Sequence, residues 1–173
     1  MSHLHKKVYK DNQQLIPYIN GFLWPLEILN EDFDHGQTYY VEEIERVSNY
    51  EESIKKHLLD PNYVITLEEK VNWRTELELT SISFFESILN KVELNDHEKY
   101  YCLQYDRTKR EIINFVLLNE KYISLMSELI IENSKFFEVY VNWDKGSFYE
   151  CYHKDYLVDN EKGLFFLHFG TSD

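Results

Sequence analysis

The chain has 173 residues and carries 31 acidic against 18 basic side chains, a net charge of −13, while 16% of its residues are aromatic. Disordered acidic tails are poor in aromatic residues, so this composition predicts a folded protein with a strongly negative surface. Such a surface repels nucleic acid and anionic membranes, which excludes both as expected partners, and it attracts basic proteins.

The length suits one domain over residues 1–173, because no linker rich in proline, glycine or serine and no internal repeat divides the chain. Residues 13–26 form the longest uncharged stretch, which is shorter than the roughly 20 apolar residues of a membrane span. Residues 1–10 contain no apolar core of a signal peptide. With only 2 cysteines, the sequence predicts a cytoplasmic protein with reduced thiols.

The first third predicts short strands at residues 39–41, 64–67 and 73–79, with one helix among them. Ser48 followed by Glu51 forms a capping-box pattern, which predicts the start of that helix. Tyr50, Ile54 and Leu58 would form its apolar stripe, and the Asp60-Pro61 dipeptide would end it.

The middle of the chain predicts two further helices separated by a hairpin. Ser83 followed by Glu86 repeats the capping-box pattern, and the helix would run to about residue 95. Strands are predicted at 99–105 and 111–118 around a polar turn at 106–110. Asn119 would then cap a third helix, whose apolar side chains recur at helical spacing: Tyr122, Leu125, Met126, Leu129 and Ile130.

The C-terminal third predicts a three-stranded meander at residues 137–143, 148–153 and 164–169. Gly146 and Gly163 fall in the two intervening turns, where a positive φ is expected. Together the elements predict an α+β fold with a mainly antiparallel sheet and about three helices.

No catalytic, cofactor or metal motif can be placed. The 5 glycines are isolated, so phosphate-binding loops are absent, and the sequence has no Gly-x-Ser-x-Gly or Cys-x-x-Cys pattern. A zinc site from Cys102, Cys151 and His153 matches no known ligand spacing. His168, in the last strand, is a candidate base, although a single strand histidine is more often simply hydrogen-bonded in place.

Residues 32–43 resemble a calcium-binding loop, because Asp32 stands at its first position and Glu43 at its twelfth. The glycine required at the sixth position is one residue early, at Gly36, so no calcium is predicted. A polar loop in which Gly36 allows the turn is the favoured interpretation of this segment.

The acidic residues concentrate between residues 27 and 60, where ten acids face three bases, a net −7 of the total −13. This segment is either a docking face for a basic protein or a device for solubility. The first interpretation predicts a bacterial immunity or antitoxin-type inhibitor, whose carboxylates would replace the phosphates bound by a basic, nuclease-like toxin. The expected contact residues are Asp32, Asp34, Tyr39, Tyr40, Glu42, Glu43 and Glu45.

Two other classes remain open at this point. A small hydrolase-type enzyme would require a pocket that contains His168 or His153. A self-associating structural or adaptor protein, of phage or mobile-element origin, would require an apolar surface patch and a symmetric dimer.

Overall fold

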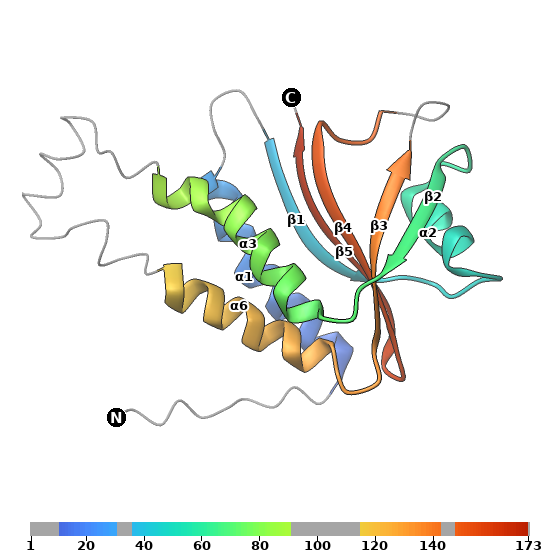
Figure 1. Ribbon diagram of the computed structural model, residues 1–173, viewed down its shortest axis with the longest axis horizontal. Helices are drawn as coiled ribbons and strands as arrows, with labels where there is room; N and C mark the ends of the chain where they lie inside the picture. Colours follow the sequence, from blue (N-terminus) through green and yellow to red (C-terminus); the bar gives the residue numbers. More distant parts are fainter. Residues whose placement is uncertain (1–10, 31–35, 91–114, 143–147, 173) are drawn as a thin grey trace, which may run out of the picture.

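A computed structural model describes residues 11–30, 36–90, 115–142 and 148–172. Within these ranges the chain forms an antiparallel sheet with the strand order β1-β5-β4-β3-β2 (Figure 1). The predicted α+β class is confirmed. The elements are α1 Asn12–Asn30, β1 Gly36–Glu43, α2 Tyr50–Leu58, β2 Val64–Glu69, α3 Trp73–Asn90, α6 Phe115–Leu129, β3 Lys135–Asn142, β4 Tyr152–Asn160 and β5 Gly163–Ser172.

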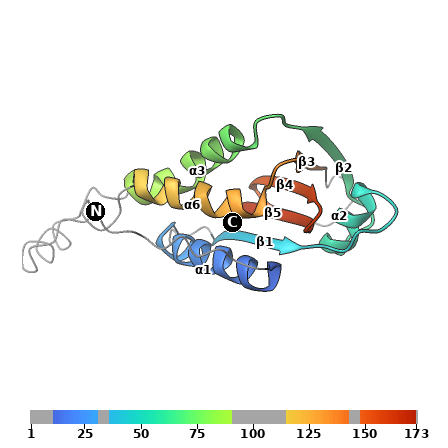
Figure 2. The same ribbon diagram turned by 90° about the horizontal axis from the view of Figure 1, so that it is seen from below.

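Helices cover both faces of the sheet. Figures 1 and 2 show α1, α3 and α6 together on one face and α2 on the other. Alternate strand residues point to opposite faces, so β1, β3, β4 and β5 supply two apolar cores, whereas β2 contributes only to the core under α2. The core under α2 includes Ile54, Tyr63, Ile65, Leu157 and Phe166.

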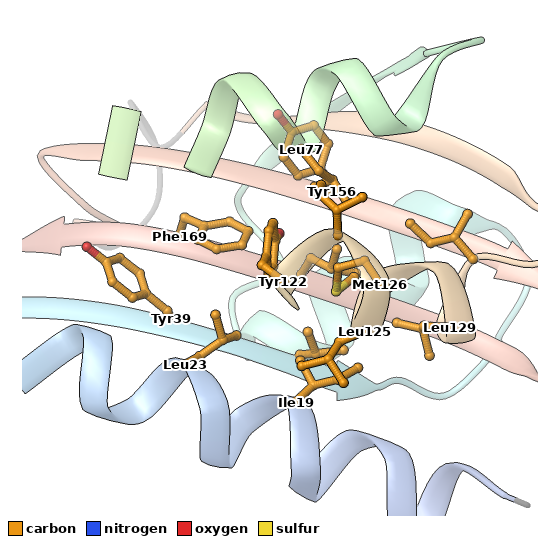
Figure 3. Close-up of a cluster of buried hydrophobic side chains, with 14 of the residues drawn as sticks. Ile19, Leu23, Tyr39, Leu77, Tyr122, Leu125, Met126, Leu129, Tyr156 and Phe169 are labelled. Atoms are coloured by element: carbon orange, nitrogen blue, oxygen red, sulfur yellow. The ribbon is translucent and has the colours of Figure 1, made fainter. Parts of the chain in front are cut away.

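The larger core lies under the three helices (Figure 3). Aromatic residues of the sheet, of α3 and of α6 meet aliphatic residues of the three helices there, and the rings touch mainly edge to face. The labelled side chains in Figure 3 are Ile19, Leu23, Tyr39, Leu77, Tyr122, Leu125, Met126, Leu129, Tyr156 and Phe169.

The predicted meander is confirmed as β3, β4 and β5, which are neighbours in the sheet. Its middle strand was misplaced, because β4 begins at Tyr152 and residues 148–151 precede it without strand structure. Asn160 pairs with Gly163 across the turn between β4 and β5. The other turn, with Gly146, lies outside the described residues.

Gly163 is required for a different reason than the predicted one. No glycine in the described ranges has a positive φ, so that expectation is wrong for Gly163. A Cβ atom there would lie 2.8 Å from Glu43 Oε1 and 2.8 Å from Phe165 Cζ. The position therefore favours glycine mainly because the buried Phe165 ring lies against its backbone, whereas the exposed Glu43 side chain can move aside.

Helix α2 agrees with its prediction apart from a shift of the cap. Asn49, rather than Ser48, is the N-cap, and its side-chain oxygen accepts a hydrogen bond from Glu52 N at 2.9 Å. At the other end Leu59 adopts a left-handed conformation with φ of 59°, one residue before Asp60.

Helix α3 corrects two predictions. Residues 73–79, expected as a strand, are its first turns, and Ser83 lies inside the helix instead of capping a new one. Leu77, Phe84 and Phe85 are spaced to lie on one buried face, so tertiary packing overrides the local cap pattern.

Helix α6 also begins earlier than predicted. Residues 115–118 are helical instead of extended, and Asn119 accepts a hydrogen bond from Ser81 Oγ at 2.6 Å instead of capping the helix. The predicted apolar stripe from Tyr122 to Ile130 is buried, as expected. The strand predicted at 99–105, the turn at 106–110 and residues 111–114 lie outside the described residues.

Helix α1 was not predicted at all, and it covers the β1 edge of the sheet. The Asn20 side chain donates to Val41 O at 2.9 Å and accepts from Val41 N at 2.8 Å, while Glu27 Oε1 accepts from Tyr39 N at 2.5 Å. These side chains pair with backbone groups of β1 that a further strand would otherwise bind, which protects the edge from unwanted pairing. In the described ranges, no helix has both the length and the apolarity needed to cross a membrane.

Candidate functional site

The residues predicted to form the acidic docking surface do not all lie on one face of the sheet. Asp32 and Asp34 lie outside the described residues. Tyr39 is 2% exposed, and its hydroxyl donates to Gln37 Oε1 at 2.9 Å. Its ring packs against Phe85 in the helical core, so Tyr39 cannot contact a partner without local unfolding, and it is removed from the candidate surface.

Tyr40 points to the opposite face of the sheet, because side chains alternate along β1. Its half-buried ring lies 4.9 Å from the ring of His168. Burial, together with the carboxylates of Asp155 and Glu42, raises the pKa of the Tyr40 phenol, which therefore stays neutral at physiological pH.

The three predicted glutamates of this segment are exposed but face different neighbours. Glu42 Oε2 lies 4.0 Å from Nδ1 of His57 on the α2 side. Glu43 accepts a hydrogen bond from Asn12 Nδ2 at 3.2 Å on the α1 side. Glu45 forms an ion pair with Lys56 at 2.6 Å. They surround the end of β1 instead of forming one compact cluster.

A buried histidine–carboxylate pair lies on the α2 face, and the sequence analysis found only half of it. Asp155 of β4 and His168 of β5 are directly opposite in register, and Asp155 Oδ1 lies 2.7 Å from His168 Nδ1. Tyr149 donates its hydroxyl to the other carboxylate oxygen at 2.8 Å. Asp155 is 0% and His168 3% exposed.

The register explains how this pair could have been found. Asn160 and Gly163 pair across the turn, so counting five residues away from the turn on each strand reaches Asp155 and His168. The turn itself was predicted correctly, but its exact register was not fixed. Tyr149 and Glu150, which come from the segment before β4, carried no sequence signal.

The contact orients the imidazole. A carboxylate oxygen accepts hydrogen bonds, so Nδ1 of His168 is the ring atom that donates to Asp155, and Nε2 points away from it. Nε2 lies 3.8 Å from Glu150 Oε1. A carboxylate that orients a histidine in this way is the arrangement found behind general bases, and it serves equally as a buried polar link between two strands.

Gly170 makes room for this histidine. A Cβ atom at Gly170 would lie 2.4 Å from His168 Nε2 and 3.1 Å from the carboxyl carbon of Glu150. Gly170 and His168 are two residues apart on β5 and therefore point to the same face. The imidazole consequently lies over the glycine backbone.

We expect Gly170→Ala to lower the free energy of unfolding by about 1–3 kcal/mol, because the methyl group would displace the His168 ring from Asp155. Urea denaturation measures this change. In a His168→Ala background the same substitution should cost much less, since the ring that it displaces is gone. An equal cost in both backgrounds would contradict this account.

Further titratable groups surround the pair. His57 of α2 lies 5.0 Å from the Phe166 ring, and His153 of β4 lies 4.9 Å from the Tyr149 ring, as ring-centre distances. Within the described part of the chain, His57 Nε2, His153 Nδ1 and Glu150 Oε2 are buried without a hydrogen-bond partner. Burial lowers the pKa of His57 and of His153 and raises the pKa of Glu150.

These shifts predict a loss of stability on acidification. Because the folded-state pKa of His57 and His153 is below the unfolded value, the unfolded chain binds more protons as pH falls through about 6.5, and the free energy of unfolding decreases. Glu150 has the opposite effect on the free energy of unfolding. Because its pKa is raised in the folded state, the folded chain binds the proton first as the pH falls, which stabilises it.

His57→Phe separates these contributions. The neighbours of His57 include Glu42 and Tyr40 of β1 and Phe166 of β5, and Glu42 opposes the dominant effect of burial. We expect the variant to lose less stability than the wild type between about pH 7.5 and pH 5.5 in urea denaturation. Parallel pH profiles for the two proteins would show that His57 does not contribute.

No group in the described ranges combines three or more histidine, cysteine, aspartate or glutamate side chains in a geometry that could hold a metal ion. Cys151 is exposed just before β4 and His153 is half-buried within it, whereas Cys102 lies outside the described residues.

Comparisons with protein-family models, with curated proteins and with solved structures find no match for this chain. Fold and site together define an α+β protein with exposed carboxylates at the end of β1 and a buried histidine–acid cluster on the α2 face. Its function is therefore inferred from these residues and their geometry.

Proposed function

We propose that the protein binds a basic protein partner and acts as an inhibitor of the immunity or antitoxin type. The observation that carries the proposal is the exposure of glutamates along residues 42–52. Glu42 is 60% and Glu45 66% exposed as side chains. The exposed acids of this stretch are Glu42, Glu43, Glu45, Glu51 and Glu52.

Charge supports association more than it supports tight binding. Opposite charge steers partners together and can raise association rates toward 10⁸–10⁹ M⁻¹s⁻¹ at low salt. Part of the negative charge is balanced within the chain, because Lys56 pairs with Glu45 and Lys55 lies 3.6 Å from Glu52. Such exposed pairs are weak, so a basic partner can replace them at low cost.

The first step is to establish whether a toxin-like reading frame lies directly beside this gene. The test then reverses Glu42, Glu43 and Glu45 to lysine and measures association with the product of that reading frame. Stopped-flow at low and at physiological salt should show a fall in association rate of about tenfold or more at low salt, and a smaller fall at high salt. Folding stability should change by about ±0.5 kcal/mol for each exposed site.

A matched control reverses three exposed glutamates elsewhere: Glu120, Glu132 and Glu161. It makes the same change in net charge, so it isolates the effect of position. Equal losses in both triple variants would assign the attraction to net charge alone. The proposal would be contradicted if the association rate did not depend on salt and did not change when Glu42, Glu43 and Glu45 were reversed. The acidic segment would then serve solubility.

A second candidate is a small hydrolase-type enzyme, which the Asp155–His168 contact favours. His168 would act as the general base and Asp155 would orient it. Because His168 is 3% exposed, this function also requires local opening of the segment around Tyr149 and Glu150 to admit a substrate. A panel of chromogenic ester and phosphate-ester substrates tests this function. Activity in the wild type that His168→Gln abolishes would support it, and the absence of turnover across the panel would count against it.

A further inference from the structure

Residues 148–151, which we call the flap, lie against the histidine–carboxylate pair of the α2 face without being part of the sheet. They have no strand structure, and the ladder between β4 and β5 starts only at Tyr152, which pairs with Thr171. Asp155 and His168 are nevertheless 0% and 3% exposed. A short segment outside the strand ladder therefore helps to bury the pair.

Tyr149 supplies the contacts that hold the flap closed. Its hydroxyl donates to Asp155 Oδ2 at 2.8 Å and lies 3.2 Å from His168 Nδ1. Its ring packs edge to face against Tyr63, at 5.8 Å between ring centres, and against His153 at 4.9 Å. One side chain thus links the flap to β4, to β5 and to the residue before β2.

Two buried polar atoms oppose the closed position. Within the described ranges, Glu150 Oε2 and His153 Nδ1 have no hydrogen-bond partner. Burial raises the pKa of Glu150 and lowers the pKa of His153, so the closed position disfavours the charged form of both groups. A buried polar atom without a partner is costly, and movement of Tyr149 and Glu150 away from the sheet would let water bind both atoms.

We propose that the flap opens as a unit while the sheet stays folded, and that this motion uncovers His168 and Asp155. Closing gains the contacts of Tyr149, whereas opening hydrates Glu150 and His153, so the two positions compete. In the closed position Glu150 Oε1 lies 3.8 Å from His168 Nε2, and opening makes this nitrogen accessible. The motion is independent of the acidic docking surface around the end of β1, and it is a condition for the hydrolase-type function.

The end of the ladder marks the hinge. From Tyr152 to Asn160 strand β4 pairs with β5 in one continuous register. Immediately before it, Cys151 N donates to Thr171 O at 3.1 Å. This hydrogen bond breaks when the flap opens, whereas the pairs of the ladder remain, so the Cys151 amide reports the motion.

Native-state hydrogen exchange of the full chain tests the proposal. The Cys151 amide should be protected, and its exchange rate should not change with urea below the unfolding transition, because a local opening exposes little surface. The amide of Tyr156, which lies opposite Leu167 in the ladder, should instead follow global unfolding. The same urea dependence at both amides, or no protection at Cys151, would overturn the proposal.

Two variants should shift the flap in opposite directions. Tyr149→Phe removes the hydroxyl contacts and should lower the protection factor of the Cys151 amide about two- to tenfold. Glu150→Leu removes the unsatisfied carboxylate and should raise this factor about twofold or more. Tyr152→Phe is the matched control, because its hydroxyl lies 3.1 Å from Ser83 Oγ of α3, on the other face of the sheet. Equal losses in the two tyrosine variants would contradict the proposal.

Modification by diethyl pyrocarbonate tests whether the motion uncovers His168. Mass spectrometry of the peptides gives the rate at which each imidazole reacts. His168 should react about two- to tenfold faster in Tyr149→Phe than in the wild type, while the rate of His57 of α2, which packs on Phe166, should not change. A common increase at both histidines would indicate unfolding of the sheet, and an unreactive His168 in both proteins would show that the flap stays closed. Either result would overturn the proposal.

Discussion

Asp155→Ala is expected to lower the free energy of unfolding by about 2–4 kcal/mol, because it removes the buried acceptor of two hydrogen bonds. The carboxylate is fully buried and accepts from His168 Nδ1 and from the Tyr149 hydroxyl. Alanine would remove the acceptor that both groups share. The Tyr149 hydroxyl and His168 Nδ1 lie 3.2 Å apart, so their mutual contact can satisfy only one of them. Urea denaturation followed by circular dichroism measures the loss.

Graded variants separate the contributions to this contact. Tyr149→Phe removes one hydrogen bond and should cost about 0.5–1.5 kcal/mol, while Asp155→Asn keeps an acceptor for one donor and should fall between the two. A double-mutant cycle of Asp155→Ala with His168→Ala should give a clear coupling energy, because the residues are in contact. A loss below about 1 kcal/mol for Asp155→Ala would show that water replaces the carboxylate easily.

The parts of the fold that the sequence predicted well are those specified by local signals. Alternating side chains and a polar turn placed β3 and β5, and a cap followed by an apolar stripe placed α2 within one residue. In these segments the local preferences and the tertiary packing agree, so a short window of sequence is sufficient.

Helices α1 and α3 could not be predicted from local sequence patterns, because their residues favour other structures in isolation. Helix α1 contains Pro17 and Pro25, which disfavour a helix interior, and residues 80–85 of α3 are all serine, β-branched or aromatic. In both segments the helix is stabilised by burial of one of its faces against the sheet. That packing depends on segments far away in the sequence, which a local pattern does not contain.

The candidate site shows the same limit. Charge density identified Glu42, Glu43 and Glu45 as exposed acids, yet it grouped Tyr39 with Tyr40 although the two point to opposite faces of β1. The pairing of Asp155 with His168 depends on strand register. Predicting that register would require the position of the turn to be known to within a single residue. Composition alone does not supply that precision.

Phe169→Ala is expected to cost about 3–5 kcal/mol, because it opens a cavity where three elements meet. The Phe169 ring lies 5.8 Å from Tyr39 of β1, 5.7 Å from Phe84 of α3 and 6.1 Å from Tyr122 of α6, between ring centres. Its side chain is fully buried, so no surface rearrangement can fill the space cheaply.

The control for this prediction is Phe148→Ala, since Phe148 is 56% exposed and its truncation should cost less than about 1 kcal/mol. Phe169→Leu should fall between the two, because leucine fills part of the cavity. Urea denaturation gives the three free energies, and near-ultraviolet circular dichroism reports the environment of the surrounding rings. A loss below about 2 kcal/mol in Phe169→Ala would mean that α3 and α6 move inward to close the cavity, and the three-helix layer would then be less rigidly packed than its ring contacts imply.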